Sequence, residues 1–387
     1  MKDGFKVYDA DTHCSLPAEQ LESYLSPKVL ELVPDLDSHL REVKIGHAGE
    51  VFEAPFRHRW SFSAMSGGWG GSQPRVLGEA EPRDQKRHFQ TFMGSRFPSY
   101  GGNEFADIRI KDMDEEGVDV HMMVGNGANN APDPEVEMEF IRANHRCLND
   151  MCSQYPGRLK TMIVVTARSI EESVKEIEKW GDAPWAVAVQ PHMPLDYPID
   201  HPDMAPIWSA AQDAGLTVVH HSFATGYPGY RDLWESPFIG RSASHPWAAM
   251  RFVAAVTGSG MMDRYPTLNF AILESGFGWL PFWSRRLDDQ MIYVGYVNET
   301  LKYKPSEYLT SGRFFASIEM HEGPEMAKQV IELMGENILM LGTDYPHAES
   351  RFPESTSIVL DWQNQGVSES AMRKLMWDNA VNCFGQP

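Results

Sequence analysis

The chain has 387 residues, of which 42% are hydrophobic and 11% aromatic, so it can bury a substantial core and is not mainly disordered. Its 34 basic and 54 acidic residues give a formal net charge of −20, which argues against nucleic acid and anionic membranes as partners because such a field repels polyanions. The four cysteines lack a CxxC spacing, and no apolar stretch resembles a signal peptide or a membrane span, so we expect a cytoplasmic protein.

Short apolar or β-branched runs alternate along the chain with longer amphipathic stretches, a pattern typical of βα units and a parallel sheet. The eight runs are Val7–His13, Val118–Val124, Lys160–Thr166, Ala186–Gln190, Leu216–His221, Leu268–Glu274, Phe314–Glu319 and Ile338–Asp344. Eight strands, mostly followed by helices, favour a (β/α)8 TIM barrel over a doubly wound sheet. We therefore predict one barrel domain over residues 1–387.

Three of the intervening stretches predict helices clearly: Ser169–Trp180, Pro324–Met334 and Glu369–Cys383. In the first of them, Ser169 and Glu172 have the spacing of a capping box.

Two stretches depart from the alternation and are rich in Gly, Pro and charged or aromatic residues. Residues 38–105 predict a long insertion after the first strand, either a lid or a subunit contact. Residues 222–244 directly follow the fifth strand. Both belong to βα-loops, and these loops build the active site in a TIM barrel.

Polar residues end several of the predicted strands, as a barrel active site requires. Asp9, Asp11 and His13 alternate along the first strand, so we expect them to share one face. One imidazole from the fifth strand and Asp344 from the eighth would complete a nitrogen and oxygen set suited to Zn²⁺, Mn²⁺ or Fe²⁺. The alternative for Asp344 is a turn in which it caps the next helix.

Several segments resemble one family when taken together. VYDADTHC, GLTVVHHS, SHPW, MDRYPTLNFAILESGFGWLPFWSRRLD and NILMLGTDYPH resemble the amidohydrolase-related enzymes, in the branch that holds aminocarboxymuconate-semialdehyde decarboxylase and the hydroxybenzoate decarboxylases. MDEEGVDVHMMV and MRKLMWDNAVNCF are similar to that branch as well. The resemblance covers nearly the whole chain except residues 38–105.

The resemblance implies a role for individual residues. Asp11, His13, His221 and Asp344 match the metal ligands, with His221 rather than His220 set by the preceding Leu-Thr-Val run. His245, in SHPW, matches the catalytic histidine of the decarboxylases and is suited to carry a proton.

Glu274 is the second catalytic candidate, for orienting ligands or binding substrate; its alternative is a buried ion pair with Arg285 or Arg286. The first-strand pair is Asp-x-His rather than His-x-His, which leaves the metal open. We expect one divalent ion, Zn or Mn, with Fe as a further option.

Other residues are candidates for binding a second metal or the substrate. His192 and Glu319 could bind a second metal or support the first, although His192 beside a proline is also an ordinary loop residue. The substrate-binding candidates, which could instead form the packed core of a lid or a dimer contact, are Arg231, Arg241, Trp234 and Tyr230, with Arg57, Arg59, Trp60 and Trp69 from the insertion.

The function most consistent with these features is non-oxidative decarboxylation of an aromatic or unsaturated carboxylic acid by a metal-dependent lyase. A hydrolase that uses metal-bound hydroxide on a C–N, ester or C–C bond is the second hypothesis. A dinuclear iron or manganese oxygenase and an inactive structural subunit are the third and fourth. The partners we expect are a small carboxylic acid and further copies of the chain, as a homodimer or higher oligomer, with a hetero-oligomer left open.

Overall fold

A computed structural model describes residues 1–42, 46–47, 50–51, 58–60, 62, 105–125, 131, 133–193, 198–221, 237–295, 299–347 and 350–387. Its main sheet has eight parallel strands that pair in chain order. They are β1 (Tyr8–Cys14), β6 (Val120–Gly125), β7 (Leu159–Thr166), β8 (Ala186–His192), β9 (Thr217–His221), β10 (Phe270–Leu273), β11 (Phe314–Ser317) and β12 (Leu339–Met340). Each of the eight predicted strands is confirmed, with its ends within a few residues.

The sheet closes on itself through the segment that follows β12. The backbone N–H of Ala10 donates to the carbonyl of Leu341 at 2.8 Å, and that of Asp344 donates to the carbonyl of Asp11 at 2.9 Å. Thr12 and Tyr345 form a parallel bridge farther along. The predicted (β/α)8 barrel is therefore confirmed, and its closure places the ends of the first and eighth strands side by side.

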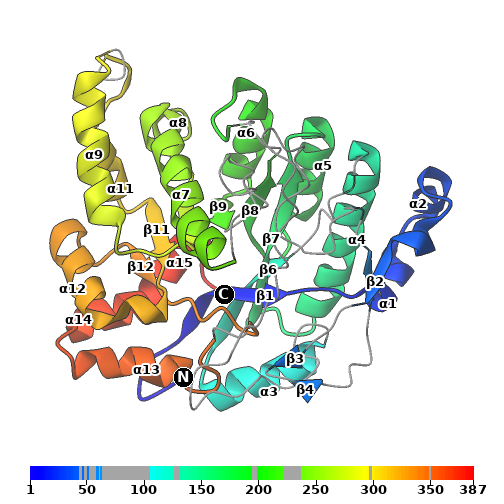
Figure 1. Cartoon of the computed structure of the whole chain (residues 1–387), viewed down its shortest axis with the longest axis horizontal. Coiled ribbons are helices and arrows are strands. Elements are labelled where there is room, and N and C mark those ends of the chain that lie inside the picture. Colours follow the sequence, from blue (N-terminus) through cyan, green and yellow to red (C-terminus); the bar gives the residue numbers. More distant parts are fainter. Residues whose placement is uncertain are drawn as a thin grey trace, which may run out of the picture.

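Helices surround the barrel on its outside (Figure 1). They are α3 (Ala106–Glu116), α4 (Pro134–Cys152), α5 (Ile170–Trp180), α6 (Ala205–Asp213), α7 (Pro237–Gly258), α8 (Met261–Arg264), α9 (Leu280–Tyr293), α11 (Pro305–Leu309), α12 (Gly323–Met334) and α13 (Ser355–Leu360), with the short α1 (Ala18–Leu21) and α2 (Pro27–Leu32) after β1. Within the described part of the chain, none of these helices combines the length and the apolar character needed to cross a membrane.

Helix α5 has the predicted position but not the predicted cap. The side chain of Ser169 makes no capping hydrogen bond. Glu172 instead pairs with Arg142 of α4 and with Lys175, 2.7 Å away on its own helix. Because these cations lie close to Glu172, the capping box is replaced by ion pairs along the surface.

The C-terminal segment covers the end of the barrel where the strands begin. It runs through α14 (Glu369–Arg373), a π-helical turn (Lys374–Asp378) and α15 (Asn379–Phe384). The predicted helix is therefore present but interrupted. The ring of Phe384 stacks on that of Tyr8 with centroids 6.1 Å apart, inside the apolar cluster that fills the barrel. This end is consequently apolar, and polar groups gather at the opposite end.

The described parts of the insertion include two small antiparallel pairs. They are β2 (Leu40–Glu42) with β5 (His58–Trp60), and β3 (Gly46–His47) with β4 (Glu50–Val51). The ring of Trp60 is buried against Phe140 of α4, with centroids 5.6 Å apart. Trp60 therefore packs against a helix of the barrel. Arg57, Trp69 and most of residues 38–105 lie outside the described residues.

Candidate metal centre

Strand β1 contains a bulge that decides which of its side chains reach the site. The register with β6 shifts between Asp9 and Thr12. Asp9 turns toward Thr343, whose backbone N–H and hydroxyl both donate to its carboxylate. The prediction that Asp9 shares a face with Asp11 and His13 is therefore wrong, because the extra residue breaks the alternation.

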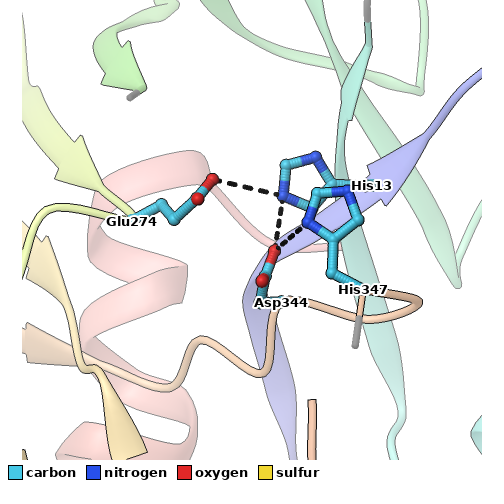
Figure 2. Close-up of side chains that lie close together, drawn as sticks. All are labelled: His13, Glu274, Asp344 and His347. Carbon is cyan, nitrogen blue, oxygen red and sulfur yellow. Dashed lines mark ion pairs between the residues drawn. The ribbon is translucent and has the colours of Figure 1, made fainter. Parts of the chain in front are cut away.

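Asp11 and His13 meet residues from three other strand ends. His13 Nε2 lies 2.8 Å from Oδ1 of Asp344 and 3.6 Å from Oε2 of Glu274 (Figure 2). His221 Nε2 lies 3.0 Å from the same Glu274 oxygen and 3.6 Å from Oδ1 of Asp11. The predicted ligand set and Glu274 are thus gathered at one point of the barrel mouth, and all five side chains are buried.

The backbone of Glu274 has the left-handed conformation, with φ of 47°. Leu273, just before it, packs in the barrel interior, so strict alternation would direct Glu274 outward. The left-handed turn brings its side chain into the mouth instead. Asp344 has φ of 61° as well. Such conformations cost about 1–3 kcal/mol each in a residue other than glycine and concentrate at functional sites.

The two histidines at the end of β9 point in opposite directions. His221 faces the carboxylates of Asp11 and Glu274. The ring of His220 stacks on Phe252 of α7 with centroids 5.3 Å apart. His221 rather than His220 therefore faces the candidate metal centre, in the strand register that the resemblance implied.

Burial and neighbouring charges together shift the pKa values of the cluster. Burial lowers the pKa of His13, and the neighbouring His347 lowers it further. Burial also opposes charge on His221, but the carboxylates of Asp11 and Glu274 outweigh it and hold the pKa of His221 well above its ordinary value. For Asp344, the nearby His347 and His13 outweigh burial and hold its pKa well below the usual range.

The residues fit a divalent cation. Oδ1 of Asp11, Nε2 of His13 and both carboxylate oxygens of Asp344 are buried without a partner in hydrogen-bond geometry among the described residues. Asp11, His13 and His221 form one group of convergent donor atoms, and His13, Glu274, Asp344 and His347 form another, with the atoms of each within 4.8 Å of one another. Oxygen and imidazole donors without thiolates suit Mn²⁺, Fe²⁺ or Zn²⁺.

Sequence reasoning missed His347. Its Nδ1 lies 2.7 Å from Oδ1 of Asp344, and its ring stacks on that of His13 with centroids 3.9 Å apart. The signal was present as a histidine three residues after the predicted ligand, in GTDYPH. Because these residues form no regular element, no periodicity indicated that the side chain returns to the site.

His192 belongs to a separate network. Its Nδ1 lies 2.7 Å from Oε1 of the buried Glu137, whose other oxygen accepts a hydrogen bond from Arg168 at 2.9 Å. A guanidinium on the same carboxylate disfavours a cation there.

Glu319 lies at the edge of the candidate metal centre. A small cavity beside Asp344 is lined by Glu319, Met320, His321, Gly342, Thr343, Asp344 and Arg351. Arg351 brings a guanidinium to this side, and burial lowers its pKa.

The structure describes the remaining candidate substrate-binding and catalytic residues only in part. Arg231, Trp234 and Tyr230 lie outside the described residues. The backbones of Arg241 and His245 belong to α7, but their side chains are not described. Pro246, which directly follows His245, lies inside this helix and does not start it.

The amidohydrolase family model matches residues 10–386. The chain belongs to the amidohydrolase family. The matched residues include every group of the candidate metal centre described above, from Asp11 to His347.

Two proteins to which the chain is similar are named as decarboxylases. The chain is 24% identical over 309 residues to a gamma-resorcylate decarboxylase of Polaromonas sp., covering 73% of this chain and 87% of the relative. It is 23% identical to the 2-amino-3-carboxymuconate-6-semialdehyde decarboxylase of Dictyostelium discoideum, covering 72% and 76%.

The crystal structure of 5-carboxyvanillate decarboxylase from Novosphingobium aromaticivorans, complexed with manganese and 4-hydroxy-3-methoxy-5-nitrobenzoic acid, has the same fold. It matches with a TM-score of 0.63 at 20% identity, over 99% of this chain and 97% of that one.

Proposed function

We propose that this amidohydrolase-family chain is a divalent-metal-dependent decarboxylase of an aromatic or unsaturated carboxylic acid. The observation that carries the proposal is the convergence of Asp11, His13, His221, Glu274 and Asp344 at the mouth of the barrel. The decarboxylase activity named for the relatives supports the choice of reaction.

The proposed ligands are Asp11, His13, His221 and Asp344, and the convergence of their buried donor atoms supports this role. A bound divalent ion supplies Lewis acidity that stabilises negative charge on substrate oxygens. Manganese in the related structure favours Mn²⁺ as the first ion to test, with Zn²⁺ and Fe²⁺ next.

The reaction breaks one C–C bond and forms one C–H bond. The carboxylate leaves as CO₂, its bonding electron pair stays on the substrate carbon, and that carbon takes up one proton. Glu274, held in the mouth by its left-handed backbone, and His245 on α7 are the proposed groups that hold and deliver the proton. Such a step requires no oxidant and no water-derived oxygen in the product.

The substrate is proposed to be a small carboxylic acid. Arg351, which lines the cavity beside Asp344, adds a described guanidinium to the proposed pocket residues Arg231, Arg241, Trp234 and Tyr230. Glu319 lines the same cavity and is proposed to orient bound groups. For His192, which bonds to Glu137 outside the candidate metal centre, the proposed role is limited to ordering the loop after β8.

Self-association and a cytoplasmic location are also proposed. Large apolar side chains are exposed on α9 and before α11, namely Phe282, Ile292, Tyr293 and Tyr303, and support a subunit contact. Light scattering on the purified chain would give twice the monomer mass or more, whereas a mass of 43.7 kDa would exclude a stable oligomer.

The decisive experiment is product analysis in D₂O with a panel of ortho-hydroxybenzoates and the Mn²⁺-loaded protein. We expect one CO₂ and one deuterium on the vacated carbon per turnover, and loss of both in His13→Ala. His201→Ala, at a histidine whose Nδ1 lies 3.7 Å from Asp203 just before α6, is the matched control. Oxygen from ¹⁸O-labelled water in the organic product would indicate hydrolysis. Consumption of O₂ with two metals per chain would indicate an oxygenase.

A further inference from the structure

His347 is held against the candidate metal centre by two contacts. Its Nδ1 lies 2.7 Å from Oδ1 of Asp344, the same oxygen that lies 2.8 Å from Nε2 of His13. The rings of His13 and His347 are nearly parallel, with centroids 3.9 Å apart and an interplanar angle of 24°. Figure 2 shows both imidazoles directed at this carboxylate, with Glu274 facing them from the other side.

The exposure of His347 makes this fixed position unusual. Its side chain is 43% exposed, whereas those of His13, Glu274 and Asp344 are each 8% exposed or less. A half-exposed histidine could turn into solvent, yet the ring of His347 stacks on His13 and its Nδ1 faces the carboxylate oxygen that His13 also faces. A shared partner for both rings explains this arrangement.

A cation supplies such a partner. The donor atoms of His13, Glu274, Asp344 and His347 all lie within 4.8 Å of one another, which is the spacing of groups around a single ion. We propose that His347 binds the metal through Nδ1, as a ligand on the solvent side of the centre.

This inference rests on the proposed metal site and extends it by one ligand. The site then holds three imidazoles, from His13, His221 and His347, beside its carboxylates. A set of this size suits an ion that accepts five or six ligands, such as Mn²⁺ or Fe²⁺, better than tetrahedral Zn²⁺. His347 lies in the segment after β12, three residues after the proposed ligand Asp344.

The test counts the nitrogens that bind manganese. Pulsed electron paramagnetic resonance of the Mn²⁺-loaded, full-length protein should show three histidine nitrogens coupled to the ion, and His347→Ala should show two. The affinity for Mn²⁺, measured by competition with a chelator, should fall by about 10-fold or more in His347→Ala. His201→Ala, whose side chain is 37% exposed and pairs with Asp203, should change neither quantity.

The outcomes separate this inference from the proposed function. Two coupled nitrogens in the unaltered protein, with an unchanged count in His347→Ala, would overturn the role of His347 and leave the other ligands in place. Manganese binding that survives in both His13→Ala and Asp344→Ala would overturn the proposed site itself. The nitrogen count of the unaltered protein decides the first question even if a variant fails to fold.

Discussion

Nε2 of His221 lies 3.0 Å from Oε2 of Glu274, although the two residues end neighbouring strands with different backbone conformations. His221 continues the alternation of β9, whereas Glu274 reaches the same point through a left-handed turn. The pair links a proposed ligand to a proposed proton donor, so the two roles can be separated by substitution.

Glu274→Gln tests the proposed proton donor. If Glu274 delivers the proton and the other four side chains bind the metal, we expect kcat to fall by about 10²–10⁴-fold. Manganese content, measured by elemental analysis, should remain that of the unaltered protein. Loss of the metal together with activity would instead make Glu274 a ligand.

The two histidines at the end of β9 provide a matched pair of variants. His221→Ala removes a group that faces Asp11 and Glu274, so we expect Mn²⁺ affinity to fall by about 10-fold or more. His220→Ala removes a ring that packs on Phe252, so it should lower the melting temperature while the metal stays bound. The reverse pattern would show that the assignment on this strand is wrong.

Ser317 connects two carboxylate residues of the centre. Its hydroxyl donates to Oδ2 of Asp11 at 3.2 Å and accepts from the backbone N–H of Glu274 at 3.1 Å. Ser317→Ala leaves that buried N–H without its acceptor, which we expect to cost about 1–3 kcal/mol of unfolding free energy. Mn²⁺ affinity should fall by about 10-fold or more. Ser311→Ala, at an exposed serine just before β11, is the control, and equal metal affinities in the two variants would contradict the role of Ser317.

Gly342 lies between Asp11 of β1 and Ser317 of β11, where there is no room for a side chain. A Cβ there would lie 2.9 Å from Cβ of Ser317 and 3.1 Å from Cβ of Asp11. Gly342→Ala should therefore displace one of these residues and weaken metal binding, as measured by chelator competition. An alanine variant with unchanged affinity and melting temperature would show that the three segments can separate without cost.

The buried carboxyl of Glu116 should make the free energy of unfolding depend on pH. Burial raises its pKa to about 7, and a hydrogen bond from the backbone N–H of Ser355 offsets this only in part. Because the folded pKa is higher than the unfolded one, the stabilisation is present at low pH and is lost as pH rises through about 7. Relative to the unaltered protein, Glu116→Gln should gain up to about 3 kcal/mol between pH 4.5 and pH 8.

Urea unfolding across this pH range checks the Glu116 prediction. Glu115→Gln, at an exposed position on the same helix, is the matched control variant. If the unfolding free energy of Glu116→Gln changed with pH in parallel with that of the unaltered protein, the buried carboxyl of Glu116 would not cause the pH dependence.

The fold could be predicted because the eight strands are short β-branched runs buried on both faces, which the sequence displays directly. Predicted positions at strand ends, such as His221 and Asp344, meet in the barrel because parallel strands end at one rim. Asp9 was placed on the wrong face, since a bulge leaves no mark in the periodicity. His347 was missed because only the irregular path after β12 brings it back to His13.

Contacts between residues of different elements explain two smaller differences between the sequence predictions and the structure. The Ser169 and Glu172 spacing matched a capping box, but Arg142 from the neighbouring helix competes for the carboxylate. The sequence left Trp60 open between a substrate contact and the packed core of a lid or dimer contact, and in the structure its ring packs on Phe140 of α4. Both depend on residues that lie far apart in the sequence.

Titration of the metal-free protein with Mn²⁺ tests the central claim most directly. Release of CO₂ from an ortho-hydroxybenzoate substrate should rise linearly with added metal, level off at one equivalent per chain, and remain absent in His13→Ala at every metal concentration. Full CO₂ release without metal, or undiminished release in His13→Ala, would contradict metal-dependent decarboxylation at this site.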